Sequence, residues 1–222
     1  MLFCEEKKFI FVAVPKTGSG AIQTRLVECD PEVRRNAAID ETGTWVEMPN
    51  HASARQIRKV MGSRAKDYTF IAFLRDPRSV ILSKFHFLRE GRAARLQGLT
   101  GQPRPEGVRF NLGITMRVLF AQALPLRVWS QLYPFRSSGS FVTDENGTLI
   151  VDEIGLMERL QEDVNRIFGR YGYSKADLDL PMWNRTDYDR ATFDLGVLDG
   201  VAARRLSRDI ALYRVAIKKS AR

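Results

Sequence analysis

Histidine and cysteine are scarce in this chain, which has two of each among its 222 residues. Cys4 and Cys29 cannot form a disulfide framework, and no Cys/His group has the spacing of zinc ligands. The longest apolar run, Phe9 to Val14, has six residues, whereas a membrane-spanning helix needs about 20. The first eight residues lack the basic start and apolar stretch of a secretory signal. These absences favour a reduced, cytoplasmic globular protein with no bound metal and no integral membrane segment.

Acidic residues are few in one long stretch of the chain. From His51 to Arg109 there are 13 Lys and Arg against 4 Asp and Glu, a surplus of 9 that equals the net charge of the whole chain, +9. Such a local positive field attracts nucleotides, phosphorylated or sulfated substrates, or nucleic acid. A solvated basic face with no partner would have the same composition. Aromatic residues for base stacking are scarce there, which counts against a nucleic-acid-binding or other polyanion-binding module.

Short apolar segments alternate with helical patterns along the chain. Strands are predicted at Phe9–Val14, Thr44–Met48 and Tyr68–Leu74, with a small hairpin turning at Asn146-Gly147. Helices are predicted after the glycine turn at 18–20, over 54–61 between an Asn50 N-cap and a Gly62 stop, after Asp76-Pro77, and over about 112–124, 156–171 and 199–218. This order predicts an α/β fold, a three-layer α/β/α sandwich with a P-loop-like parallel sheet, as one domain over 1–222.

The stretch 91–111 interrupts these patterns with four glycines, two prolines and four arginines. We predict a mobile loop there that orders over an incoming acceptor as a lid. The arginines that would meet an anionic acceptor are Arg92, Arg95, Arg104 and Arg109. A passive surface insertion would have the same composition.

Polar residues follow each of the three predicted strands at the point where the strand ends. The first strand leads into Lys16-Thr17-Gly18-Ser19-Gly20, the second into Asn50-His51, and the third into Arg75-Asp76. Ligands of parallel α/β sheets bind outside the carboxyl ends of the strands. We therefore expect these three segments to contribute to one site.

The glycine turn has the chemistry of a phosphate-binding loop. A loop that opens a helix directs backbone N–H groups and the positive end of the helix dipole at an anion, so we expect Lys16 to Ala21 to hold a phosphate. Gly18 and Gly20 permit close approach, Lys16 adds a cation, and Ser19 adds a hydroxyl. Nucleoside triphosphate loops of the form G-x-x-x-x-G-K-[ST] place lysine after the glycines, whereas here it precedes them. A tight turn with an incidental lysine remains the alternative.

A second candidate phosphate site follows the third strand. The segment RDPRSVILS places Ser83 eight residues after Arg75, two turns into the predicted helix. A guanidinium and a hydroxyl that converge in this way could hold a second phosphate. An Arg–Asp pair that closes a turn is the commoner explanation of R-D-P.

The two elements together resemble the sulfotransferases that use 3′-phosphoadenosine 5′-phosphosulfate (PAPS), and most closely their carbohydrate-type branch with its small bacterial relatives. The matching segments, in order, are PKTGSG, HASA at 51–54, FIAFLRDP at 70–77, VDEIGLMERLQEDVNRIF and LPMWNRT, so the resemblance runs from about residue 9 to 215. The chain departs from the family at Arg78-Ser79-Val80 after R-D-P, and at Leu156, where the family has arginine in I-G-R-x-E.

The resemblance implies a role for each segment. Lys16 would stabilise charge on the departing nucleotide, and His51 would act as general base toward the hydroxyl of a saccharide or small-molecule acceptor, although a histidine there could instead cap a helix. Arg75 and Ser83 would hold the 3′-phosphate, no metal would be needed, and a loop would close over the nucleotide through Asn184, Arg185 and Thr186. The other histidine, His86, is expected to pack within a helix. The alternative enzyme class is a small-molecule kinase or nucleotidase on the same fold.

Overall fold

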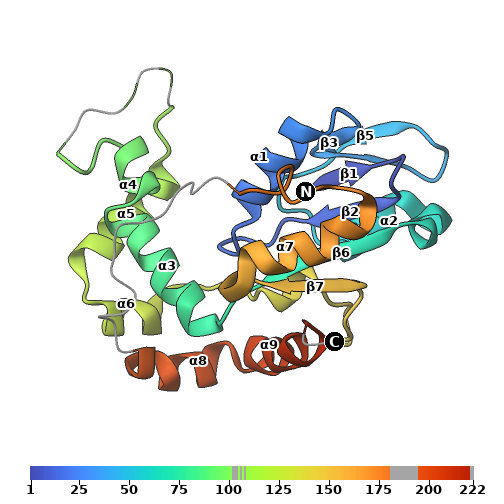
Figure 1. Ribbon diagram of the computed structural model, residues 1–222. Coiled ribbons are helices and arrows are strands. Elements are labelled where there is room, and N and C mark those ends of the chain that lie inside the picture. The colour runs from blue at the N-terminus through green and yellow to red at the C-terminus, as the bar shows by residue number, and fades with distance from the viewer. Residues whose placement is uncertain (102–104, 106, 108, 181–194, 221–222) are drawn as a thin grey trace. The chain divides into compact units, whose positions relative to one another are not determined.

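The computed structural model describes residues 1–101, 105, 107, 109–180 and 195–220 (Figure 1). Their contacts divide the chain into two compact units. The first comprises Met1–Asp76, Arg136–Trp183 and Arg208–Arg222, and the second comprises Pro77–Phe135 and Asn184–Ser207. Each unit is therefore built from separate stretches of the chain, and the single domain expected from the sequence stays a prediction.

A five-stranded sheet in the order β3-β1-β2-β6-β7 organises the first unit. Its strands are β1 (Leu2–Cys4), β2 (Phe9–Val12), β3 (Val33–Arg35), β6 (Thr69–Leu74) and β7 (Glu153–Leu156). β2, β6 and β7 are parallel, whereas β1 is antiparallel to both β2 and β3. The predicted parallel sheet is thus confirmed for β2, β6 and β7, but the sheet is mixed at β1, because the short connection between β1 and β2 can only join antiparallel strands.

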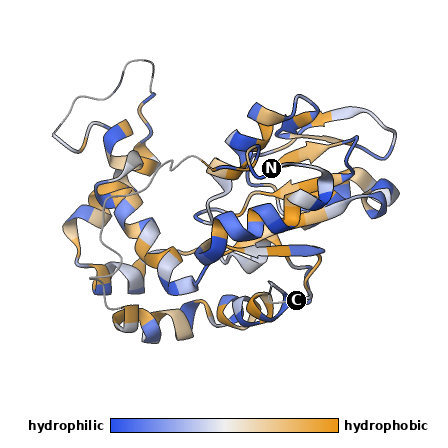
Figure 2. Ribbon diagram, in the orientation of Figure 1, coloured by the Kyte–Doolittle hydropathy of each residue, from blue (hydrophilic) through white to orange (hydrophobic). Residues whose placement is uncertain are grey.

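Helices cover both faces of this sheet. Ile10 and Val12 pack with α2 (Ala54–Met61) and α9 (Ser207–Ser220), whereas Phe9 and Phe11 point to the other face and pack with α1 (Ser19–Cys29) and α7 (Leu160–Phe168). Strands buried on both faces are apolar at every position, as the orange central strands in Figure 2 show. The α/β class is confirmed, and the helices on both faces fit the predicted α/β/α layering.

The strand predicted at 44–48 forms, but it does not belong to the large sheet. β5 (Trp45–Glu47) pairs antiparallel with β4 (Ala37–Ile39) in a separate two-stranded sheet. The expectation that three strands of one sheet deliver the site residues is therefore wrong for the strand before His51.

The helix that follows His51 has a different start from the one predicted. Its N-cap is Ser53, whose hydroxyl accepts from the backbone N–H of Gln56 while the Gln56 side chain accepts from the Ser53 N–H. This reciprocal capping box satisfies two N–H groups at once, so Asn50 is not the cap. The predicted stop at Gly62 is confirmed, with φ of 55°.

The chain from 142 to 171 combines one confirmed prediction with one error. The hairpin at Asn146-Gly147 is confirmed by a bridge between Thr143 and Leu149, with Gly147 at φ 82°. The helix predicted over 156–171 begins only after a strand, β7, which pairs parallel with β6, and Gly155 lets the Phe73 ring of β6 pack directly against the backbone. The 3-10 helices η3 (Met157–Arg159) and η4 (Gly169–Tyr171) flank α7, and η1 (Gly62–Asp67) and η2 (Gly139–Phe141) lie elsewhere in the first unit.

The second unit is helical in its described part. It contains α3 (Pro77–Arg89), α4 (Arg92–Leu96), α5 (Leu112–Ala123), α6 (Leu126–Leu132), η6 (Leu195–Leu198) and α8 (Asp199–Arg205). The predicted buried face of α3, Ile81, Leu82, Phe85 and Leu88, is confirmed. The loop predicted at 91–111 is wrong over 92–96, which is helical, and the helix predicted over 199–218 is interrupted at Leu206.

Candidate functional site

The turn between β2 and α1 has an unusual backbone. Lys16 has φ of 69° and Gly18 has φ of 75°, whereas Thr17 between them is not in the positive-φ region. Alternation of this kind turns successive N–H groups toward one side and forms a concave anion-binding nest. No side chain caps α1 at Gly18, so the first N–H groups of the helix also point outward. A non-glycine residue held at positive φ costs about 1 kcal/mol or more, which makes Lys16 a strained position that the fold retains.

The two hydroxyls of the turn hold it together from within. Thr17 Oγ1 donates to the carbonyl of Val14 at 2.9 Å, and Ser19 Oγ donates to the same carbonyl at 3.0 Å. Both side chains are buried. Sequence reasoning assigned the Ser19 hydroxyl to the anion, whereas in this structure its proton is used inside the turn.

The two glycines of the turn have different surroundings. A Cβ at Gly18 would lie 2.8 Å from both Leu160 Cδ2 and Met157 Sδ, so α7 and the turn before it pack directly against this backbone. Gly20 is exposed, and a Cβ there would meet nothing within 4 Å. The N–H of Ala21 donates to the Gly18 carbonyl at 3.0 Å, so this predicted ligand-binding amide is engaged within the helix.

The carboxyl ends of β6 and β7 reach the same edge of the sheet as the turn. Arg75, directly after β6, donates from Nη1 to the carbonyl of Lys16 at 3.2 Å. The next backbone N–H, that of Asp76, donates to Glu158 Oε1 at 3.2 Å. Glu158 was not singled out from the sequence. Recognising β7 as a strand would have pointed to it, because it then becomes a polar residue just past a strand end. The edge therefore combines two cations, on Lys16 and Arg75, with two carboxylates, on Asp76 and Glu158.

The remaining nucleotide-binding candidates are separated from this edge or not described. Ser83 is buried on α3, in the second unit, whereas Arg75 belongs to the first. Their pairing therefore stays a prediction. Asn184, Arg185 and Thr186 lie outside the described residues.

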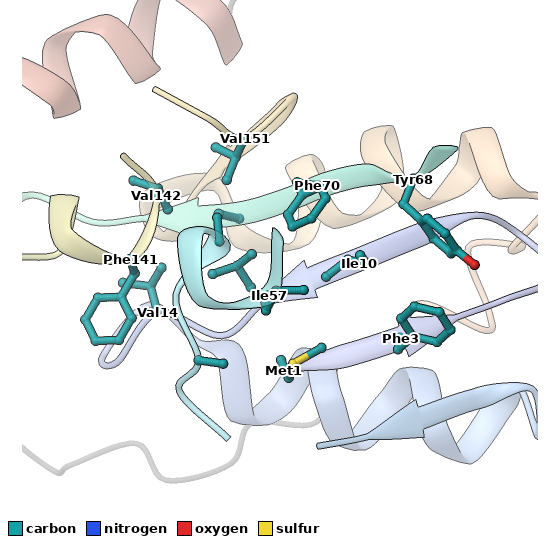
Figure 3. Close-up of a cluster of buried hydrophobic side chains, with 14 of the residues drawn as sticks. Met1, Phe3, Ile10, Val14, Ile57, Tyr68, Phe70, Phe141, Val142 and Val151 are labelled. Atoms are coloured by element: carbon teal, nitrogen blue, oxygen red, sulfur yellow. The ribbon is translucent and has the colours of Figure 1, made fainter. Parts of the chain in front are cut away.

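His51 is tied to the strand that carries the turn. Its Nδ1 lies 2.6 Å from the carbonyl oxygen of Ala13, the residue directly after β2. A carbonyl only accepts, so Nδ1 carries the proton, and in the neutral ring Nε2 holds a lone pair. The ring edge packs against Phe141, 6.5 Å between centroids, and Figure 3 shows Phe141 beside Val14 at the carboxyl end of the sheet. The exposed His51 thus presents a proton-accepting nitrogen at the predicted edge.

The other histidine has a local partner in the second unit. His86 Nδ1 lies 2.5 Å from Glu90 Oε1, one turn further along and just past the end of α3. This contact agrees with the expectation that His86 packs within its helix.

A groove of about 760 Å³ lies elsewhere in the first unit, between the hairpin segment 137–149 and α9. Arg55 and Arg208 are among its lining residues, and Arg55 forms an ion pair with Glu145 at 2.9 Å. None of the predicted site residues that the structure describes lines it. Within the described part of the chain there is no group of three His, Cys, Asp or Glu side chains that could hold a metal ion. In the same residues no helix is long and apolar enough to cross a membrane.

No family model, no curated protein and no solved structure matches this chain. The family resemblance therefore rests on the five motifs in the sequence, and the structure contributes the geometry of the residues in four of them.

Proposed function

We propose that this protein is a PAPS-dependent sulfotransferase that transfers a sulfuryl group to an acceptor hydroxyl, on a fold related to the P-loop enzymes. The observation that carries the proposal is the strained turn from Lys16 to Gly18, which leads straight into α1 without a side-chain cap. Strained backbone at a strand end is typical of ligand sites. The ordered sulfotransferase-like motifs of the sequence support the same conclusion.

The residues of the turn fit the 5′-phosphosulfate half of the donor. The alternating backbone directs N–H groups outward, Lys16 adds positive charge, and open space above Gly20 leaves room for an anion. Arg75 bonds to the Lys16 carbonyl and so supports the turn from the neighbouring strand. By the resemblance, Arg75 with Ser83 would hold the 3′-phosphate, and Asn184 to Thr186 would close over the nucleotide.

When bound, PAPS supplies the sulfuryl group on a good leaving group. His51 Nε2 would accept the proton of the acceptor hydroxyl, whose oxygen would take the sulfuryl group from the phosphate oxygen of the donor. The bonding pair of the broken bond would leave with the phosphate, so negative charge would develop on the phosphate oxygen released from sulfur. Lys16 and the turn amides stabilise that charge where it develops, a contribution typically of about 10²–10³ in kcat for one such donor. The Ala13 carbonyl keeps the His51 ring in the tautomer that the proton transfer requires.

One observation favours a second candidate, a small-molecule kinase or nucleotidase. Asp76 and Glu158 place two carboxylates at the ends of β6 and β7, and carboxylate oxygens are the protein ligands that Mg²⁺ prefers. The loop, however, lacks the G-K-[ST] step of such enzymes.

Calorimetry separates the two candidates. Adenosine 3′,5′-bisphosphate should bind with excess chelator present, and more tightly than ATP with magnesium. The variant Gly20→Ala should weaken this binding by filling the open space, while its exposed site leaves folding intact. Gly169→Ala is the matched control, since a Cβ there also meets nothing within 4 Å.

The ligand that the protein prefers separates the candidate functions. Preference for ATP with magnesium would favour the kinase. Steeply salt-dependent binding to DNA without nucleotide affinity would favour a polyanion-binding module. Transfer of labelled sulfate to saccharides and small alcohols then identifies the acceptor.

A further inference from the structure

The helix α5 exposes a row of large apolar side chains. Leu112, Met116 and Leu119 are 64%, 57% and 44% exposed. Spacings of four and three residues place all three on one side of the helix. Val118 and Ala121, on another side, are buried, and α5 contacts α3 and α4. A helix that is apolar nearly all round is normally buried, so this row is a face without a partner among the described residues.

The exposed apolar surface of the second unit extends beyond this row. Leu132 on α6 is 59% exposed. Val128, one turn before Leu132, is also exposed. Single exposed apolar residues are ordinary, whereas several on consecutive elements mark an interaction surface. We name Leu112, Met116, Leu119, Val128 and Leu132 the α5–α6 face.

The same stretch of sequence carries positive charge and almost no negative charge. From 107 to 135 there is no Asp or Glu, whereas Arg109, Arg117 and Arg127 occur there. Over 77–135 as a whole, nine Lys and Arg stand against two Glu. All three arginines are exposed. Because these exposed arginines lie within and directly before α5 and α6, a partner that is both apolar and anionic fits this surface best.

We propose that the α5–α6 face docks the protein peripherally on an anionic lipid bilayer. Leucine and methionine side chains on one side of a helix enter the boundary between headgroups and acyl chains, and arginines beside them attract anionic headgroups. A second copy of the chain is disfavoured as the occupant, because a symmetric dimer brings identical patches together and would oppose this basic surface to itself. The proposal is independent of the sulfotransferase assignment.

Vesicle sedimentation of the full chain tests the proposal. The protein should sediment with vesicles of phosphatidylcholine mixed with phosphatidylglycerol, more weakly with phosphatidylcholine alone, and less as salt is added. Leu119→Glu should weaken binding to the mixed vesicles about tenfold or more, since it removes an apolar side chain that the bilayer would bury. Arg127→Gln should weaken it about fivefold, the usual effect of one arginine near an anionic surface.

Two matched variants on α9, in the first unit, act as controls. Ile217 is 45% exposed, close to the value for Leu119, and Arg214 is exposed like Arg127. Ile217→Glu and Arg214→Gln should leave vesicle binding unchanged, and circular dichroism should show that all four variants are folded. If Leu119→Glu proves unfolded, Met116→Ser supplies the same test with a smaller change.

Three results would overturn the proposal. One is failure of the wild-type protein to sediment with the mixed vesicles. Another is an equal loss of binding in Ile217→Glu and Leu119→Glu. The third is a concentration-dependent dimer in light scattering that Leu119→Glu abolishes, which would show that a second copy covers the face.

Discussion

The imidazole of His51 and the carbonyl of Ala13 are joined by a hydrogen bond of 2.6 Å that links residues 38 positions apart. Ala13 directly follows β2 and precedes Lys16 by three residues, so the base candidate and the glycine turn are supported by the same strand. Because Ala13 can only accept, the bond also selects the tautomer that leaves Nε2 able to take a proton. The Ala13 carbonyl thus determines both the position of the His51 ring and its tautomer.

Replacing His51 separates its two roles. His51→Ala should lower kcat by about 10²–10⁴ with nearly unchanged affinity for adenosine 3′,5′-bisphosphate, since a general base contributes about this much and does not bind the nucleotide. His51→Asn keeps a donor near the position of Nδ1 but has no base, so it should retain more thermal stability than His51→Ala and be equally inactive. His86→Asn is the control. Full activity of His51→Asn would assign the proton transfer to another group.

Lys16 combines backbone strain with charge, and two variants distinguish these. Lys16→Ala and Lys16→Gly both remove the ammonium, so each should lower kcat by about 10²–10³. Only glycine relieves the positive φ of 69°, so Lys16→Gly should be the more stable of the two by about 1 kcal/mol in urea unfolding. Equal stability of the two variants would contradict the strained backbone.

Gly18 is constrained by backbone and by packing together. Gly18→Ala meets both a positive φ and the close side chains of Leu160 and Met157, so it should lose about 2–4 kcal/mol of unfolding free energy. Gly147 also has a positive φ, of 82°, but a Cβ there meets nothing within 4 Å. Gly147→Ala should therefore lose only the backbone part, about 1–2 kcal/mol. A similar loss of unfolding free energy in both variants would mean that the Leu160 and Met157 side chains can move aside from a Cβ at position 18 without destabilising the fold.

Alkaline stability should depend on Tyr68. Its hydroxyl donates to Glu5, to which Lys8 also donates at 2.6 Å, and burial together with the bond to Glu5 raises the pKa of Tyr68 to about 12. The unfolded chain ionises near pH 10, so Tyr68 stabilises the fold below about pH 10 and loses that contribution as pH rises toward about 12. Thermal unfolding of Tyr68→Phe should therefore show a lower melting temperature at neutral pH and a shallower fall across this window.

A second substitution in the cluster tests the cause of the shift. In Glu5→Gln the pKa of Tyr68 should move back toward its ordinary value, as followed by ultraviolet titration. The pKa of Tyr173 is also raised by burial and by its bond to Asp30, so Tyr173 also makes stability fall at alkaline pH. Tyr173→Phe is therefore best combined with both the wild-type chain and Tyr68→Phe. If the double variant Tyr68→Phe/Tyr173→Phe loses melting temperature as steeply as the wild type above about pH 10, the two tyrosines are not the cause of the alkaline loss of stability.

Local patterns predicted much of the fold correctly. Continuous apolar runs identified β2 and β6, the four-residue spacing of Ile22 and Leu26 identified α1, and Asp76-Pro77 identified the start of α3. These features depend on neighbouring residues and on burial on both faces of a sheet, which leave a signature in any short window. The same reasoning located the glycine turn and the polar residues after each strand end.

Other features were decided by contacts between distant segments. β7 is a strand because it pairs with β6, against which Gly155 accommodates Phe73, and the sheet is mixed because β1 pairs antiparallel with β2 and β3. The Ser19 hydroxyl was expected to be available to the anion, yet it bonds to the Val14 carbonyl, as the Thr17 hydroxyl also does. A residue pattern states which groups exist but not which of several partners each one takes, since that choice depends on geometry set by the whole core.

For this protein, then, the order of its residues determined the glycine turn, the apolar strands and the basic surplus, because each follows from the residues of one short stretch of sequence. Tertiary structure alone decided that Lys16 is held at positive φ, that Glu158 joins the edge, and that His51 presents Nε2. Each of these depends on a hydrogen bond or a packing contact between segments far apart in the chain, and such contacts exist only once the sheet has assembled.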